Sequence, residues 1–334
     1  MLTTGCGTLG YLFQAGHGQL ALINHARPIT EVLKDERTPP RLRGLLAEIP
    51  SIKTFGEEKG LKATSNYSDY VGLDRPAAVW VVSAAETLRF KSKEWSFPII
   101  GRVPYLGWFR LESAKDFASE LEREGWDVDV RGAGAYSTLG WFQDPVLSSM
   151  IPPGEEAQGE LVNIVLHESV HATFYVNGQT AFNESLASFV ADRLTDEFLA
   201  AKYGKASGVS LAYYQSVQAR SARDKLFRKA FDDLNALYES NRSEDEKLAS
   251  KIRLLSALKT ALNTRRELNN ASLIQYKAYN SAEAEFLELY SRCGSDWKRF
   301  WEAIRALNEK SFPEPQYPAF GRVILESAGN CAAK

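Results

Sequence analysis

Two histidines spaced four residues apart constrain this chain more than any other feature of its sequence. His167 and His171 enclose Glu168 in the stretch VLHESVHATF, and the residues that flank this motif are uncharged and free of proline. On an α-helix, residues i and i+4 project from the same face, so both imidazoles can reach one metal ion. The alternative is an amphipathic helix that carries two surface histidines. Because HExxH on a helix is a recognised zinc pattern, the motif predicts a metal site.

A catalytic zinc needs a third protein ligand and an open fourth position. The HExxH helix should end near residue 177, and a second helix should span residues 180–204. Glu184 then lies about 6 Å along the returning helix and comes back to the level of His171. We therefore predict that His167, His171 and Glu184 bind one Zn²⁺ per chain. The alternative for Glu184 is an acid favoured by the helix dipole.

This ligand set predicts a zinc metallopeptidase. The ion would polarise the scissile carbonyl and lower the pKa of its bound water towards ~7. Glu168 lies beside the ion rather than on it, so it can take the proton of this water as general base and pass it to the leaving amine. A tyrosine phenol would stabilise the oxyanion, and Tyr136 and Tyr279 are the candidates. For either tyrosine, packing in the core is the alternative.

The predicted strand over residues 127–134 offers a place for the substrate. An unpaired strand edge can bind a peptide backbone as an added strand. Gly134 and Ala135, at the end of this strand, are therefore expected to contact substrate. Asn269 and Asn270 are further candidates, and their alternative is simply to break a helix.

The order of the elements predicts an α+β fold with a largely helical C-terminal half. Strands are expected at 78–82, 98–103 and 127–134, with a helix between the last two that has Ser113 as its cap. We expect three parts packed together: an N-terminal helical segment (1–75), a zincin-like catalytic core (76–205) and a helical C-terminal region (206–334).

Net charge argues against one class of partner. The formal charge of −2 gives no electrostatic case for nucleic acid, so none is expected to bind. The expected partner is a peptide substrate.

The three cysteines, Cys6, Cys293 and Cys331, are too few for a zinc ribbon or a disulfide framework. In MLTTGC, a glycine precedes Cys6 as at the cleavage site of a bacterial lipoprotein signal, although the apolar part of such a signal is not present. Either the sequence begins shortly before a mature lipidated N-terminus, or the chain is cytoplasmic and Cys6 is an ordinary thiol. We expect the first, with Cys6 as a lipid anchor in the periplasm. A disulfide between Cys293 and Cys331 would be compatible with that location.

The run HESVHATFYVNGQTAFNESLASFV resembles a bacterial family of predicted aminopeptidases, whose members combine HExxH with Y-V-x-G-x-T-x-F-N-E-S-x-A-x-F-V. The resemblance covers most of the chain, including GCGTLGYLFQAGHGQL, FPIIGRVPYLGWF, AYSTLGWFQDP and LNNASLIQYKAY. It implies a glutamate-zincin-like fold with a twisted sheet packed on the HExxH helix. It also assigns His167, His171 and Glu184 to zinc and Glu168 to catalysis. Members typically begin with a lipoprotein signal, which favours the envelope.

Two positions depart from the glutamate-zincin pattern. Many of these enzymes place an aspartate four residues after the ligand glutamate to orient a zinc-bound histidine, and this chain has Ser188 there. The best-known aminopeptidases also carry G-x-M-E-N upstream, whose glutamate binds the free amine, but GAGAY (132–136) has no glutamate. Glu155, Glu156 and Glu160 are alternative amine anchors, although acids are common in a first helical turn.

We therefore predict a zinc-dependent metallopeptidase, and specifically an aminopeptidase. Three alternatives stay open: a metallo-endopeptidase, a catalytically inactive zinc-binding envelope protein that binds peptide or cell-wall polymer, and an interaction scaffold with an incidental HExxH. The presence of Glu168, which a purely structural site would not need, favours the enzyme.

Overall fold

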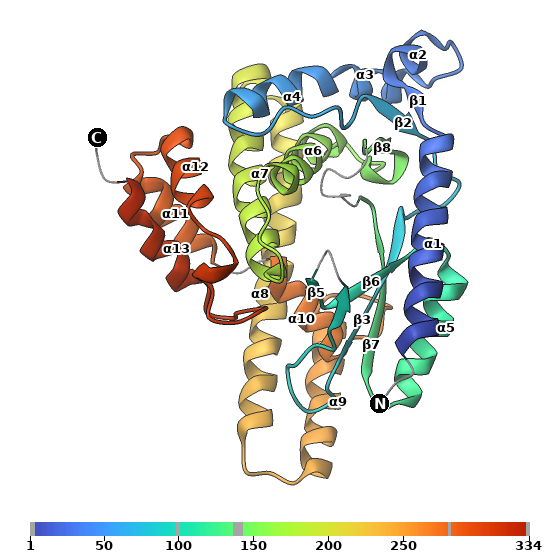
Figure 1. Cartoon of the computed structure of the whole chain (residues 1–334), viewed down its shortest axis with the longest axis vertical. Helices are drawn as coiled ribbons and strands as arrows, with labels where there is room; N and C mark the ends of the chain where they lie inside the picture. The colour runs from blue at the N-terminus through green and yellow to red at the C-terminus, as the bar shows by residue number, and fades with distance from the viewer. Residues whose placement is uncertain (1–3, 98–100, 136–142, 280–281, 332–334) are drawn as a thin grey trace.

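The computed structural model of the protein describes residues 4–97, 101–135, 143–279 and 282–331, with the backbone alone for residues 4–10, 12–13, 275–279 and 330. This part of the chain is α+β, as the sequence predicts, and combines many helices with small sheets (Figure 1). The main hydrophobic cluster includes Leu22, Leu166 and Cys331, so all three predicted parts contribute to one core.

The sheet with the longest strands has the order β6-β3-β7 and is antiparallel. Its strands are β3 (Val79–Ala85), β6 (Tyr105–Trp108) and β7 (Asp127–Ala133). The sequence of β3, VWVVSAA, is buried along nearly its whole length. Alternate residues pack against α5 (Leu111–Arg123), and α10 (Asn270–Tyr279) also packs on the sheet. Coverage by helices explains why β3 is a continuous apolar run rather than an alternating one.

A second sheet joins distant loops near the start of the HExxH helix. It contains β1 (Arg27–Pro28), β2 (Asp69–Val71) and β8 (Val146–Leu147), and β2 runs parallel to β8. The pairing places the loops that enter β2 and β8 side by side. As a result, the Tyr67 N–H donates to the Asp144 carbonyl at 2.7 Å. A separate hairpin is formed by β4 (Trp95–Phe97) and β5 (Gly101–Val103).

The HExxH helix α6 (Ala157–Thr173) and the following helix α7 (Thr180–Tyr203) pack antiparallel at the centre of the molecule (Figure 1). Asn163, early in α6, bonds Asp192 in the middle of α7 at 2.8 Å. The N-terminal helices α1 (Thr4–Asn24), α2 (Ile29–Lys34), α3 (Pro40–Ala47) and α4 (Ile49–Glu58) precede them in the chain.

One expectation about this helix is wrong in detail. The resemblance implies a sheet packed directly on the HExxH helix. Instead, α6 packs mainly against α4, α7 and α8 (Gly208–Glu239), while α5 and α10 pack on the β6-β3-β7 sheet. Polar contacts hold α10 to β7: the Asn270 N–H donates to Asp127 Oδ2 at 2.9 Å, and Ser272 Oγ donates to Asp129 Oδ1 at 3.1 Å.

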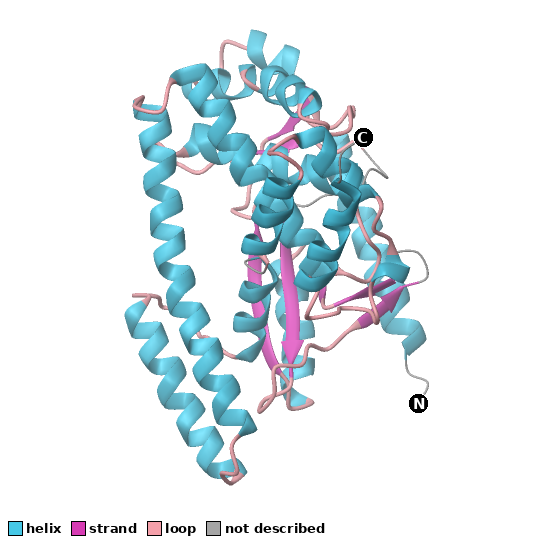
Figure 2. Cartoon of the chain, turned by 90° about the vertical axis from the view of Figure 1, so that its left-hand side faces the viewer, coloured by secondary structure: helices cyan, strands magenta, loops and turns pink. Residues whose placement is uncertain are grey.

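The C-terminal half is helical, as predicted. Helix α8 and helix α9 (Glu244–Ala261) form a long hairpin along one side of the molecule (Figure 2). Residues 241–243 lie in the turn between the two helices. Ser243 and Glu246 form a reciprocal capping box at the start of α9. Helices α11 (Glu283–Arg292), α12 (Trp297–Arg305) and α13 (Gly321–Ser327) follow, with short 3₁₀ turns around them. A disulfide joins Cys293 to Cys331 across these helices.

Several helix ends differ from the sequence expectation. Helix α5 begins at Leu111, so Ser113 lies inside its first turn rather than at its cap. Helix α6 ends at Thr173, because the next residue is already extended. Gly204, at φ +82°, terminates α7 as predicted. In the part of the chain that the structure describes, none of the helices combines the length and the apolar character needed to cross a bilayer.

Candidate metal centre

The three predicted ligands meet between α6 and α7. The Nε2 atom of His167 lies 3.4 Å from Oε2 of Glu184, and Nε2 of His171 lies 3.7 Å from the same oxygen. One ligand atom from each residue lies within 4.8 Å of the other two. Helix geometry explains the meeting, because the histidines are about one turn apart on α6 and Glu184 lies about one turn into the returning helix.

The two distances to Glu184 Oε2 are close to those between the ligands of one tetrahedral metal ion. Bonds of about 2.0–2.1 Å place neighbouring ligand atoms roughly 3.3 Å apart. The three side chains are mostly buried, with exposed fractions of 15% for His167, 7% for His171 and 11% for Glu184. Burial alone would raise the pKa of Glu184, but His171 and His167 outweigh it and hold the pKa below its ordinary value. A buried carboxylate facing two imidazoles is a suitable environment for a divalent cation.

Glu168 lies beside the ligand group, as the motif predicts. Burial raises the pKa of its carboxyl to about 7; His167 opposes this shift, and Glu184 and Asp144 add to it. Its Oε2 atom is buried and has no hydrogen-bond partner among the described residues. A carboxyl group that has an unbonded oxygen and lies beside a set of metal-ligating side chains is placed to accept and return a proton.

The turn between the two helices is fixed from inside by Asn183. The Val176 N–H donates to Asn183 Oδ1 at 2.9 Å, and Asn183 Nδ2 donates to the Val176 carbonyl at 2.8 Å. Asn183 is 1% exposed and immediately precedes Glu184. These two bonds therefore hold the first turn of α7, and with it the Glu184 carboxylate, against the histidines.

The surroundings of the histidines differ from the glutamate-zincin pattern, as Ser188 indicates. Asp192, two turns after Glu184, bonds Asn163 rather than a histidine ring. The Nδ1 atom of His171 is buried and has no partner among the described residues. His171 therefore has no protein group at Nδ1, within the described part of the chain, that would fix its orientation in the usual way.

Tyr67 is a further candidate for this site, although the sequence gives no sign of it. The side chain is 2% exposed, and its hydroxyl is buried without a partner among the described residues. Burial, then the charges of Glu168 and Asp144, raise the pKa of the Tyr67 phenol, which therefore lies near both carboxyls. Its backbone is left-handed, with φ +64°. Such a conformation is rare for tyrosine and clusters at functional sites.

The predicted substrate-binding residues do not form one group. Gly134 and Ala135 follow the C-terminal end of β7, where the Gly134 carbonyl accepts a hydrogen bond from Ser149 Oγ at 2.5 Å. Asn269 belongs to the opposite end of that strand, because its Nδ2 donates to the Val128 carbonyl at 2.6 Å. Residues 128 and 134 are about 20 Å apart along an extended strand. Gly134 and Asn269 therefore lie at opposite ends of β7, and their predicted contacts with substrate stay predictions.

Asn270 has a structural role in place of the predicted contact with substrate. The side chain is 0% exposed. Its Nδ2 donates to the Glu86 and Thr87 carbonyls at 2.8 and 3.0 Å, and its Oδ1 accepts from the Tyr238 hydroxyl at 2.7 Å. These bonds tie the start of α10 to the loop after β3 and to α8. The sequence could not distinguish this role from substrate binding, because both favour a polar residue at a helix start.

Other candidates are engaged elsewhere or lie outside the described residues. Tyr136 is outside them, and so are the side chains of Tyr279 and Cys6, whose predicted roles stay predictions. Glu160, one alternative amine anchor, accepts a hydrogen bond from Ser216 on α8 at 2.5 Å and also pairs with an arginine of that helix.

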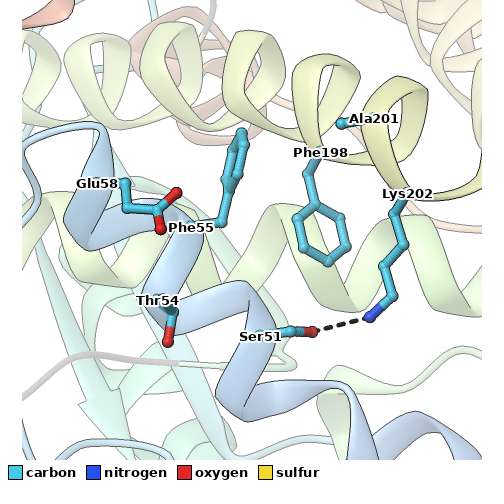
Figure 3. Close-up of a pocket in the computed structure, with 7 residues that line it drawn as sticks. All are labelled: Ser51, Thr54, Phe55, Glu58, Phe198, Ala201 and Lys202. Atoms are coloured by element: carbon cyan, nitrogen blue, oxygen red, sulfur yellow. Dashed lines mark hydrogen bonds between the residues drawn. The ribbon is translucent and has the colours of Figure 1, made fainter.

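A surface groove lies between α4 and the C-terminal part of α7, away from the metal centre (Figure 3). Phe55 and Phe198 face it, and Lys202 donates to Ser51 across it at 3.0 Å. Phe198 follows Glu184 by 14 residues on α7, a distance of about 21 Å. The groove is therefore not part of the candidate metal centre.

The fold and the site together define an α+β protein with a candidate metal centre of two histidines and one glutamate on paired helices. The family described as "Putative aminopeptidase" matches residues 10–316, and the chain belongs to this family. The family description implies a peptidase, and the match includes every residue of the metal centre. No protein with curated annotation matches the chain, and no solved structure does.

Proposed function

We propose that the protein is a zinc-dependent metallopeptidase that removes residues from the N-termini of peptides. The observation that carries the proposal is the group of His167, His171 and Glu184 with Glu168 beside it. Two imidazoles and one carboxylate with an open fourth position form a recurrent ligand set of catalytic zinc. Membership of the aminopeptidase family supports the choice of peptides as substrates.

A zinc ion held by the three ligands would supply Lewis acidity to the substrate carbonyl and to the attacking water. Glu168 accepts a proton of this water at its carboxylate as the water oxygen bonds to the carbonyl carbon. It then passes the proton to the nitrogen of the leaving amine as the carbon–nitrogen bond breaks. The Tyr67 hydroxyl donates a hydrogen bond to the carbonyl oxygen as its negative charge develops. Its buried, unpartnered hydroxyl supports this role, which the sequence had suggested for a tyrosine elsewhere.

The edge of β7 is the proposed site for the peptide backbone. Within the described sheet, β7 pairs with β3 on one side only. The strand is followed by Gly134 and Ala135, and the Ser149 contact holds Gly134 next to the 3₁₀ turn ahead of α6. A peptide that pairs with this edge as an added strand would extend from the sheet into the candidate metal centre. We also propose that α6, α7 and this edge form the catalytic part of a zincin-like fold.

The proposed location is the bacterial envelope, with a lipid on Cys6. The Cys293–Cys331 disulfide supports an oxidising compartment, because such bonds form and persist there.

Peptides with free and acetylated N-termini test the function, with the zinc content of each preparation measured in parallel. We expect the wild type to cleave the free peptide, and Glu168→Gln to retain zinc yet lose at least about 10²-fold in kcat. Equal cleavage of both peptides would indicate an endopeptidase. Full activity of Glu168→Gln would contradict the mechanism, and zinc without any cleavage would indicate an inactive zinc-binding protein.

A further inference from the structure

A segment near the C-terminus crosses the turn that joins the two ligand-bearing helices. We call this segment, residues 313–318 (PEPQYP), the strap. Three hydrogen bonds join the strap to the turn: Gln316 N–H to the Gly178 carbonyl (2.7 Å), Tyr317 N–H to Gln179 Oε1 (3.0 Å) and Gln179 Nε2 to the Glu314 carbonyl (2.7 Å). Gln179 is 4% exposed, so the two bonds that its side chain makes to the strap are shielded from water.

The Gln316 side chain caps the helix that carries the third ligand. Its Oε1 accepts a hydrogen bond from the N–H of Thr180, the first residue of α7, at 3.1 Å. Its Nε2 donates to Thr180 Oγ1 and to the Arg102 carbonyl in β5, both at 3.1 Å. Gln179, which precedes α7, makes no side-chain capping bond of its own. The first N–H of the helix therefore finds its acceptor 136 residues away in the sequence.

Aromatic packing anchors the strap at both of its ends. The rings of Phe312 and Phe320, which flank it, lie 5.2 and 6.0 Å from the ring of Phe182. Phe182 is 0% exposed and lies between Thr180 and Glu184 in the first turn of α7. The backbone of Gln316 is left-handed, with φ +53°. A glutamine adopts this conformation only where its surroundings fix it, and the hydrogen bonds and rings do so here.

We propose that the strap positions Glu184 for metal binding, with Gln316 as the positioning residue. Glu184 lies about one helical turn after Thr180, so any shift of that first turn moves the carboxylate relative to His167 and His171. The C-terminal helices, which hold none of the three ligands, thereby help to set the metal affinity of the site. This inference rests on the metal centre of the proposed function and is independent of peptide hydrolysis.

The test compares Gln316→Gly with the full-length wild type. Glycine accepts the left-handed backbone without strain, so the variant removes the side-chain bonds and leaves the path of the strap unstrained. The matched control is Ser295→Gly, because Ser295 is also left-handed, at φ +56°, and lies among the C-terminal helices. The zinc dissociation constant is measured by competition with a chromophoric chelator at a temperature where the metal-free proteins are folded, as thermal unfolding verifies.

We expect the dissociation constant to rise about tenfold in Gln316→Gly, as for residues that orient metal ligands, and to stay unchanged in Ser295→Gly. If Gln316→Gly does not fold, Gln316→Met keeps the length of the side chain without its polar atoms and should show the same rise. An unchanged constant in the folded variant, with zinc bound to the wild type, overturns the strap proposal alone. A wild type that binds no zinc overturns both proposals. Weakened zinc binding together with a wild type that cleaves no peptide supports the strap and refutes the peptidase.

Discussion

Replacing Tyr67 by phenylalanine removes one buried hydroxyl and leaves the ring in place. The structure gives this hydroxyl no partner among the described residues, and it places the phenol near Glu168. A hydroxyl that stabilised the fold would be hydrogen-bonded within it. If the hydroxyl instead serves the reaction, Tyr67→Phe should lose activity without losing stability. The two quantities should even move in opposite directions.

The size of both effects follows from the burial. Leaving a buried polar group unpaired costs about 1–3 kcal/mol, so its removal should raise the free energy of unfolding by about 1 kcal/mol at the low end of that range. An unfolding entropy of about 2.1 cal/mol/K per residue gives roughly 700 cal/mol/K for 334 residues. The expected rise in Tm is therefore about 1.5 °C. Loss of an oxyanion donor should lower kcat by about 10²–10³-fold.

Calorimetry and a peptide hydrolysis assay measure these two quantities on the same preparations. Tyr214→Phe is the matched control, because the Tyr214 hydroxyl donates to Asp196 at 2.6 Å, on α8 and α7. This control should lose about 1 kcal/mol of stability and keep its kcat. Unchanged kcat in Tyr67→Phe would refute the role of the phenol. A drop in kcat accompanied by a drop in Tm would refute the view that the hydroxyl is unpaired in the folded protein.

Three further predictions concern the ligand set, the disulfide and the correction at Asn270. Glu184→Gln removes the carboxylate whose Oε2 lies 3.4 and 3.7 Å from the Nε2 atoms of the two histidines. Equilibrium dialysis should show the zinc dissociation constant rising by about 10²-fold or more. An unchanged constant would exclude Glu184 as a ligand. The double variant Cys293→Ser/Cys331→Ser opens a link across a sequence separation of 38, and urea unfolding should show about 4 kcal/mol less stability on a chain-entropy basis. A loss below about 1 kcal/mol would contradict that account. Asn270→Ala breaks the bonds from α10 to the Glu86 and Thr87 carbonyls. It should lower the free energy of unfolding by about 2–3 kcal/mol and leave KM unchanged. A raised KM at unchanged stability would instead indicate that Asn270 binds substrate.

The grouping of the three candidate ligands could be predicted from the sequence because its geometry is local. His167 and His171 share one helix face by periodicity alone. Glu184 is reached through one short connection, although α6 ends at Thr173 rather than near residue 177. The apolar flanks of the motif also predicted a buried helix, and α6 is buried along most of its length. The α+β class followed in the same way, from the order of periodic segments.

The remaining parts of the site depend on contacts between distant segments. The Tyr67 loop lies beside Asp144 because two very short strands, β2 and β8, pair there, and strands of two or three residues leave no periodic pattern in a sequence. Its left-handed backbone would sooner suggest glycine or asparagine than tyrosine. Gln316 caps a helix 136 residues away. Capping rules consider neighbours in the chain, so they do not indicate an acceptor that lies so far away.

We propose that His167, His171 and Glu184 bind one zinc ion. Anomalous diffraction at the zinc edge, from crystals of protein purified without added metal, tests it most directly. We expect one strong peak per chain, about 2.0–2.2 Å from Nε2 of both histidines and from a carboxylate oxygen of Glu184. A peak elsewhere, or a site in which these three side chains contact only one another, would contradict it.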